Sequence, residues 1–232
     1  MSKHNVYWAP LFYDGSDWNI LHKTPETLFD RKLKEHIRTD DKRSNFFYCP
    51  AFKDFAKNTF VVTNPLRLNH TFGQANSSSI PMYQNRESCL KNYKVSQYGL
   101  SWLFFCDDDI DITVTSPYFD NVPHLQYGTI VPGKFNAGSW FRPINLEYTF
   151  YPGVDEVIIK EDEPLAYINF CTDSQVNLIR FNATEDIKKI ASTCSSGANW
   201  ESWVPMKKRY QRFKNSRLKN RLMKLIKENL YD

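Results

Sequence analysis

Between residues 101 and 180 the chain alternates short β-type runs with turn residues, and this rhythm constrains the fold more than any other feature. Residues 101–106 (SWLFFC) suit a buried strand, and residues 110–115 alternate apolar with polar side chains, as a strand with one solvated face does. Further strands are predicted at 128–131, 137–141, 145–151, 154–159, 165–171 and 175–180. Because no helical segment separates these strands, we predict a mainly β, α+β fold, built as an antiparallel jelly-roll-like sandwich.

The first hundred residues predict short helices. Thr24 is an expected N-cap with Pro25 at the first helical position, followed by an apolar stripe over 28–37. A second helix is predicted after Pro50. Residues 18–22 and 59–63 are expected strands, whereas 66–98 show little periodicity, and 74–79 within them are expected to form an exposed loop.

The end of the chain changes to a helical period. A short helix capped by Asn182 or Thr184, and a connector over 195–203, are expected to precede one long basic amphipathic helix. We therefore divide the chain into a single β-rich domain, 1–200, and a C-terminal helix, 201–232. From Pro205 to Asp232 ten lysines and arginines oppose two acidic residues, a local charge of +8, so the net +4 of the chain leaves the first 204 residues at −4.

Three uses fit such a helix. Its apolar stripe needs a cover and the rest of the chain is acidic, so docking on its own body or on a sister subunit is favoured. Binding of nucleic acid is the next hypothesis, since many cations can neutralise phosphates. Membrane contact is disfavoured because the helix has no interfacial Trp. The candidate binding residues are Lys207, Lys208, Arg209, Arg212, Lys214, Arg217 and Arg221.

An acidic run follows the apolar strand. In a strand Asp107, Asp109 and Asp111 would share one face, and they are the candidate ligands for a divalent metal. The same pattern fits a solvated strand face. An apolar strand ending in D-x-D, with Phe135-Asn136-Ala137-Gly138 downstream, is also similar to metal-dependent glycosyltransferases, although the parallel βαβ pattern that binds a nucleotide is missing upstream.

Residues 132–143 form the most unusual segment. Gly and Asn indicate an irregular turn, and Asn136, Trp140 and Arg142 are candidates for a ligand surface. The alternative is a hairpin with a packed Trp.

Other patterns limit the function. G-x-S-x-G, P-loop and G-x-G-x-x-G motifs are absent, and we expect no cofactor. Five widely spaced cysteines indicate buried thiols in a reducing compartment. With neither an export signal nor a run of about 20 apolar residues, we expect a cytoplasmic protein without a membrane partner.

Several segments, in order, resemble an uncharacterised family of proteins from tailed phages of marine bacteria and from some bacteria. They are Cys49-Pro50-Ala51-Phe52, Lys57 to Val62 with Pro65, Thr115-Ser116-Pro117, Phe135-Asn136, Trp140-Phe141-Arg142-Pro143 and Glu163-Pro164-Leu165. The resemblance covers roughly 46–180 and implies a virus-encoded β-rich protein, located in the host cytoplasm or the virion. It supplies no catalytic residues.

These observations lead to one main hypothesis. We expect a structural or binding protein without catalytic activity, which assembles with itself or another viral protein through its C-terminal helix. The alternatives are a metal-dependent enzyme that uses Asp107 to Asp111, and nucleic-acid binding by the basic tail.

Overall fold

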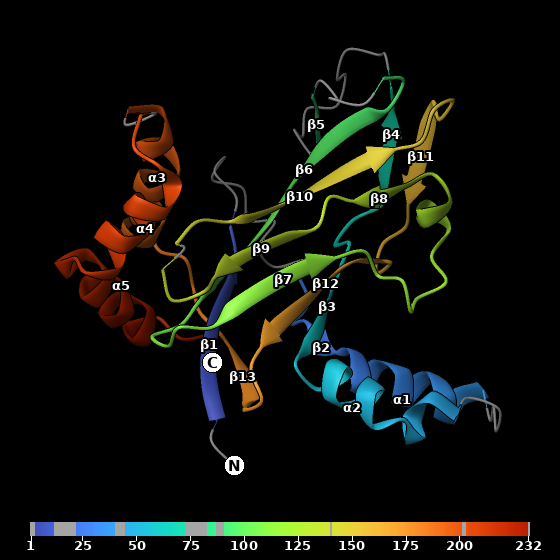
Figure 1. The fold of residues 1–232 in the computed structure, drawn as a ribbon, viewed down its shortest axis with the longest axis horizontal. Coiled ribbons are helices and arrows are strands. Elements are labelled where there is room, and N and C mark those ends of the chain that lie inside the picture. The colour runs from blue at the N-terminus through green and yellow to red at the C-terminus, as the bar shows by residue number, and fades with distance from the viewer. Residues whose placement is uncertain are drawn as a thin grey trace.

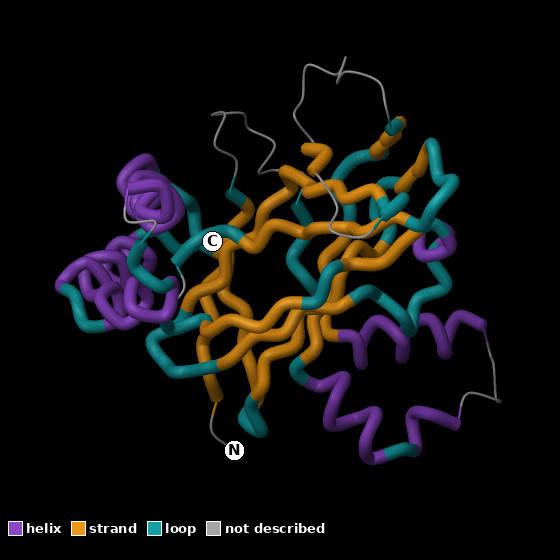
Figure 2. The backbone as a smooth tube through the Cα atoms, turned by 45° about the horizontal axis from the view of Figure 1, so that its top comes forward, coloured by secondary structure: helices purple, strands orange, loops and turns teal. Residues whose placement is uncertain are grey.

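Antiparallel strands in three sheets form the centre of the molecule, and helices lie on two sides of them (Figures 1 and 2). The computed structural model describes residues 3–11, 22–39, 45–72, 83–86, 91–139, 141–200 and 203–231. The predicted α+β class with many antiparallel strands is confirmed. Within the described residues no helix combines the length and the apolar character needed to cross a membrane.

The first large sheet has the strand order β13-β1-β6-β10-β8, with β5 also paired to β6. Its strands are β1 (Lys3–Pro10), β5 (Tyr83–Arg86), β6 (Lys94–Phe105), β8 (Gly128–Ile130), β10 (Ile144–Phe150) and β13 (Gln175–Arg180). Strand β1 pairs with β13 in parallel and with β6 antiparallel. The parallel pair joins segments that lie far apart in the sequence.

The second large sheet has the order β2-β3-β12-β7-β9, and a small third sheet pairs β4 with β11. These strands are β2 (Glu26–Thr27), β3 (Thr59–Thr63), β4 (Leu68–Thr71), β7 (Asp111–Thr115), β9 (Gly133–Asn136), β11 (Glu156–Ile159) and β12 (Pro164–Cys171). All strand pairs in the second large sheet and in the small third sheet are antiparallel.

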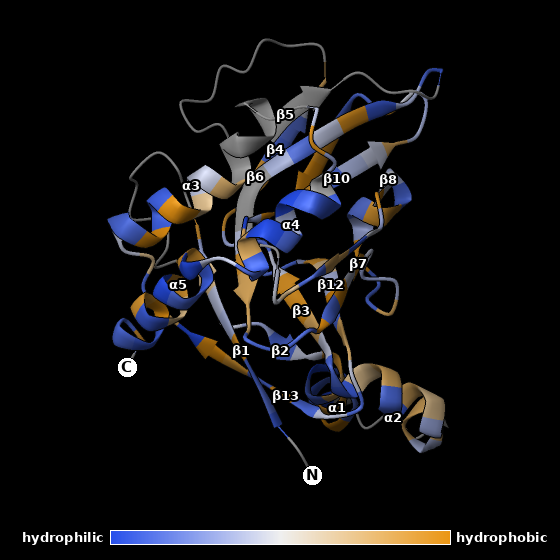
Figure 3. Cartoon of the chain, turned by 60° about the vertical axis from the view of Figure 1, so that its left-hand side comes forward, coloured by the Kyte–Doolittle hydropathy of each residue, from blue (hydrophilic) through white to orange (hydrophobic). Residues whose placement is uncertain are grey.

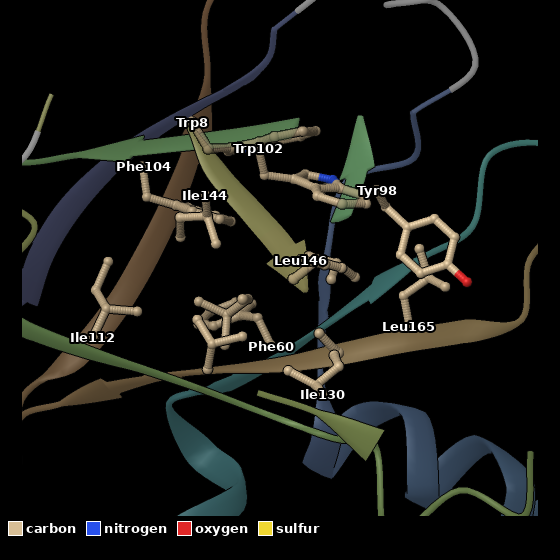
Figure 4. Close-up of a cluster of buried hydrophobic side chains, with 14 of the residues drawn as sticks. Trp8, Phe60, Tyr98, Trp102, Phe104, Ile112, Ile130, Ile144, Leu146 and Leu165 are labelled. Atoms are coloured by element: carbon tan, nitrogen blue, oxygen red, sulfur yellow. The ribbon is translucent and has the colours of Figure 1, made fainter. Parts of the chain in front are cut away.

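The main core combines side chains from both large sheets (Figure 4). Trp8, Trp102 and Phe104 come from the first sheet, and Phe60 and Ile112 from the second. A second apolar cluster lies on the other face of the first sheet, where neighbouring residues of β6 point. Leu103 and Phe105 belong to it. Strand β6 is thus buried on both faces, which explains its continuous apolar sequence.

Two helices lie beside the second sheet: α1 (Leu28–Thr39) and α2 (Pro50–Lys57), the latter as predicted. A short 3-10 turn, η2 (Asn45–Tyr48), precedes α2, and another, η3 (Pro123–Gln126), precedes β8. Helix α1 begins later than predicted, because Glu26 and Thr27 pair with β3 as strand β2. Thr27 is its cap instead of Thr24: the Thr27 hydroxyl oxygen accepts the Asp30 N–H at 3.1 Å.

The end of the chain forms three helices, α3 (Glu185–Trp200), α4 (Met206–Lys214) and α5 (Arg217–Glu228). The prediction of one long basic C-terminal helix is therefore wrong. The backbone is extended at Ser216, whose hydroxyl donates to the Phe213 carbonyl at 2.7 Å, and this separates α4 from α5. Helix α3 also continues through much of the segment expected to be a connector.

Three other predictions differ from the structure. The strand expected at 137–141 is a turn over 137–139, because the Asn136 side chain accepts the Gly138 N–H at 3.1 Å. Gly138 is required there, since an added Cβ would lie 2.2 Å from the Asp108 carbonyl oxygen. The stretch 66–98, whose sequence shows little periodicity, holds β4, β5 and the start of β6, and the loop expected at 74–79 lies outside the described residues. Of the strand expected at 18–22, residues 18–21 lie outside the described residues, and His22 is not in a strand.

Candidate anion-binding site

The acidic segment lies between β6 and β7, where each carboxylate contacts a different basic group. Lys214 Nζ lies 2.8 Å from Asp109, and Lys134 Nζ lies 2.9 Å from Asp111. His4 contacts Asp108 at 2.6 Å. Hydrogen bonds from Lys214 and Lys134 lower the pKa values of Asp109 and Asp111, respectively.

This arrangement differs from the shared strand face expected for Asp107, Asp109 and Asp111, because only Asp111 is in a strand. Asp107 instead faces the C-terminal helices, where Lys219 donates to its carbonyl oxygen at 3.0 Å and Lys227 lies 4.0 Å from its carboxylate. Among the described residues no group of three His, Cys, Asp or Glu side chains is placed to hold a metal. The acidic segment serves as the contact for α4 and α5.

Apolar contacts complete this docking. Leu222, Met223 and Ile226 of α5 are buried in the second apolar cluster with Leu103 and Phe105 of β6. Burial of one such side chain contributes about 1.5–3 kcal/mol. The chain then continues past α5 to β13, where the Tyr231 N–H donates to the Arg180 carbonyl at 3.0 Å. The apolar stripe of the tail is thus covered by the same chain.

Docking leaves many tail cations on the surface. Figure 3 shows hydrophilic residues over most of α4, which faces the viewer. Of the predicted binding residues, Lys214 contacts Asp109, and Arg209 is half-buried with its Nε donating to the Val204 carbonyl at 3.0 Å. Lys214 is also exposed, as are the other five residues of the set, Lys207, Lys208, Arg212, Arg217 and Arg221. Arg221 also lies 3.8 Å from Asp186 of α3.

A cavity of about 320 Å³ lies where α3 and α4 meet the turn between β9 and β10. Its lining residues are Ser139, Phe141, Arg142, Thr193, Cys194, Arg209, Tyr210, Arg212, Phe213, Ser216 and Leu218. Three of these are arginines, and the residues described as lining the cavity include no Asp or Glu. The Phe141 and Phe213 rings are almost parallel, with centroids 6.3 Å apart.

Burial keeps the other titratable groups of the cavity neutral. It raises the pKa of the Cys194 thiol to about 12, an effect that Arg142 opposes. Burial likewise raises the pKa of Tyr210 to about 12, although Arg142 and Arg209 favour the phenolate. Among the described lining residues the charged side chains are therefore the three arginines, and Cys194 is a protonated thiol at neutral pH.

The ligand surface predicted from the sequence is only partly assembled here. Arg142 lines the cavity. Asn136 is not a described lining residue, but its side chain makes hydrogen bonds with Gly138, Ser139 and Asp111 and so holds the turn that contributes Ser139. Trp140 lies outside the described residues. A second cavity, of about 310 Å³, opens between the large sheets and also has Arg142 in its lining.

Sequence reasoning missed five polar residues of the first cavity: Ser139, Thr193, Cys194, Tyr210 and Ser216. They come from the turn after β9, from α3, from α4 and from the residue before α5, and they match no short motif. Tyr210 belongs to the apolar stripe of the tail, so it was expected in a helix contact and not beside arginines.

A buried polar cluster in the core is a different kind of site. His124 lies 2.7 Å from Glu163 and 3.1 Å from the Tyr148 hydroxyl, which donates to the Leu165 carbonyl at 2.6 Å. The His124 and Tyr148 side chains are fully buried. A ligand cannot reach them, so this cluster stabilises the fold.

Comparisons of the chain with protein-family models, curated proteins and solved structures found no match.

Proposed function

We propose that this protein binds nucleic acid without catalysing a reaction, and that the ligand lies across α4 and the start of α5. One observation carries the proposal: the tail uses its apolar stripe against its own body and still exposes a row of cations beside a cavity lined by three arginines. Arginine and lysine side chains that face solvent in this way bind phosphates and release counterions.

The alternatives have less support. Assembly through the tail's apolar stripe would need Leu222 and Ile226, which are already buried against β6 and its neighbours. A metal-dependent enzyme would need the aspartates to converge, but Asp109 and Asp111 contact separate lysines. Neither alternative uses the exposed arginines.

We also propose a specific architecture and a viral origin for the protein. We propose a jelly-roll-like sandwich as the architecture, supported by two large sheets that share one core. A viral origin, with the protein in the host cytoplasm or virion, is proposed from the resemblance of residues 46–180 to phage proteins.

Fluorescence anisotropy with a labelled single-stranded oligonucleotide tests the function. We expect affinity to fall steeply as salt increases from about 50 to about 200 mM. Reversing three exposed charges with Lys207→Glu, Lys208→Glu and Arg217→Glu should weaken binding strongly. If these residues contact three phosphates, the slope of log affinity against log salt should decrease by roughly 2.

A matched triple variant controls for net charge. Lys53→Glu, Arg67→Glu and Lys160→Glu make the same change at exposed positions on α2 and beside β4 and β11, away from α4 (Figure 1). This variant should keep most of the affinity and the salt slope. Equal losses in both triple variants, or salt-insensitive binding by the unmodified protein, would refute the proposal.

A further inference from the structure

Binding of a strand to exposed lysines and arginines does not require an enclosed space, yet a cavity lies beside α4. Its walls come from the turn before β10 and from α3, α4 and the start of α5, so the space is bounded on several sides. A continuous duplex backbone passes over such a site without filling it. Its contents should therefore be the end of a strand.

We infer that this cavity binds the terminal phosphomonoester of a single nucleic-acid strand together with the nucleotide that carries it. This inference rests on the proposed function and names the part of the ligand that the cavity takes.

Charge is the first argument. Arg142, Arg209 and Arg212 line the cavity. A phosphomonoester carries about −1.5 to −2 at neutral pH, whereas each internal phosphodiester carries one negative charge. The guanidinium group also matches phosphate geometry, because it donates two parallel hydrogen bonds. The cluster therefore favours an end phosphate over an internal one.

Size and wall chemistry are the second argument. About 320 Å³ lies at the lower end of the range for small-molecule sites, roughly 300–1,000 Å³. Phe141, Phe213 and Leu218 supply apolar walls, and bases gain stability by contact with aromatic side chains. The hydroxyls of Ser139, Thr193 and Ser216 add hydrogen-bonding groups. This combination suits one nucleotide better than a bare inorganic anion.

The position of the surface cations is the third argument. Lys207 and Lys208 directly precede Arg209 on α4, and Arg217 begins α5 next to Ser216 of the cavity. A strand whose end occupies the cavity can therefore continue over these exposed cations.

Oligonucleotides that differ only at their ends test the inference. A 12-mer with a 5′-phosphate, the same strand with a 3′-phosphate, and the strand with hydroxyls at both ends are compared by competition anisotropy. One phosphorylated form should bind about 10- to 100-fold more tightly than the hydroxyl form, as expected for added charge-assisted hydrogen bonds. Which phosphorylated end is preferred sets the direction of the strand.

Two variants locate the preference. Arg212→Ala and Arg142→Gln should remove the preference for the phosphorylated end, and they should weaken binding of the hydroxyl strand no more than Arg221→Ala does. Arg221→Ala removes an exposed cation that is not a lining residue, and it should weaken all three strands equally. Arg212 is exposed, so its variant is expected to fold, and thermal unfolding checks this.

The outcomes separate the two proposals. Salt-sensitive binding with equal affinity for all three strands would overturn the inference and leave the proposed function standing. Absence of binding to any strand would overturn the proposed function. Titration with thymidine monophosphate and with thymidine provides a second measurement: only the monophosphate should bind, and equal binding of both would count against the phosphate site.

Discussion

Asp120 is a buried carboxylate surrounded by two cations and a phenol. Lys32 Nζ lies 2.7 Å and Arg31 Nε 3.3 Å from one of its oxygens, and the Tyr167 hydroxyl donates to the other at 2.6 Å. Burial, followed by the hydrogen bond to Asp120, raises the pKa of Tyr167, so this group stays a donor. The cluster fastens α1 to the loop before η3 and to β12.

Replacing this carboxylate should destabilise the protein strongly. Asp120→Ala leaves Lys32, which is 7% exposed, without its buried partner, and breaking such a pair costs about 3–5 kcal/mol. Denaturant unfolding monitored by circular dichroism measures the change. Asp155→Ala is the control, because its contact with Lys94 is largely exposed and should contribute at most about 1 kcal/mol. Similar losses in both variants would contradict this account.

At the scale of elements, strands with local signals were predictable. Strand β7 alternates buried with half-buried side chains as its sequence indicates, and Pro50 marks the start of α2. In contrast, the sequence of β1 mixes polar, aromatic and aliphatic residues without a clear period. Strand β1 is buried on both faces because Val6 and Trp8 lie in the main core, whereas Tyr7 and Ala9 lie in the second apolar cluster with residues of α5. Sequence windows do not contain that information.

The candidate site shows the same limit. The arginines of the tail were predicted as a binding group from their abundance, and Arg142 from an unusual segment. Their meeting with Thr193 and Cys194 depends on how α3 and α4 pack, which no local pattern encodes. The break at Ser216 was equally hidden, because the apolar spacing continues through it.

Helix α5 should depend on one central apolar contact. Ile226 is fully buried, so Ile226→Ala should cost about 2–5 kcal/mol of unfolding free energy. Ile158→Ala is the matched control, since Ile158 is 38% exposed on β11 and should lose far less. Chemical denaturation measures both. An Ile226 variant as stable as the Ile158 variant would mean that α5 is not held by this cluster.

At the scale of the whole molecule, the tail behaves as part of the folded body. The predicted boundary between residues 200 and 201 falls between α3 and α4, yet Ile187 and Ile190 of α3 share one apolar cluster with Leu222 and Ile226 of α5. One apolar cluster thus joins the first large sheet to the terminal helices α3 and α5.

Ending the chain at Trp203 should therefore damage the body. Removal of α4 and α5 uncovers Leu103, Phe105 and Phe181, so we expect aggregation or a lower melting temperature. Size-exclusion chromatography with light scattering and binding of an apolar dye detect these changes. The Lys207, Lys208 and Arg217 triple variant controls for lost charge. A stable, monodisperse truncated monomer would show that the tail is an independent appendage.

The parallel pairing of β1 with β13 also has a consequence for synthesis. Lys3 pairs with Gln175, so β1 emerges from the ribosome long before its partner exists. At about 5–20 residues per second, translation leaves β1 without that neighbour for roughly 10–35 s. Val6 and Trp8, which are fully buried in the folded protein, are exposed to other nascent chains during that interval. Strand β1 is therefore made long before its sheet is complete, and a chaperone has time to bind it.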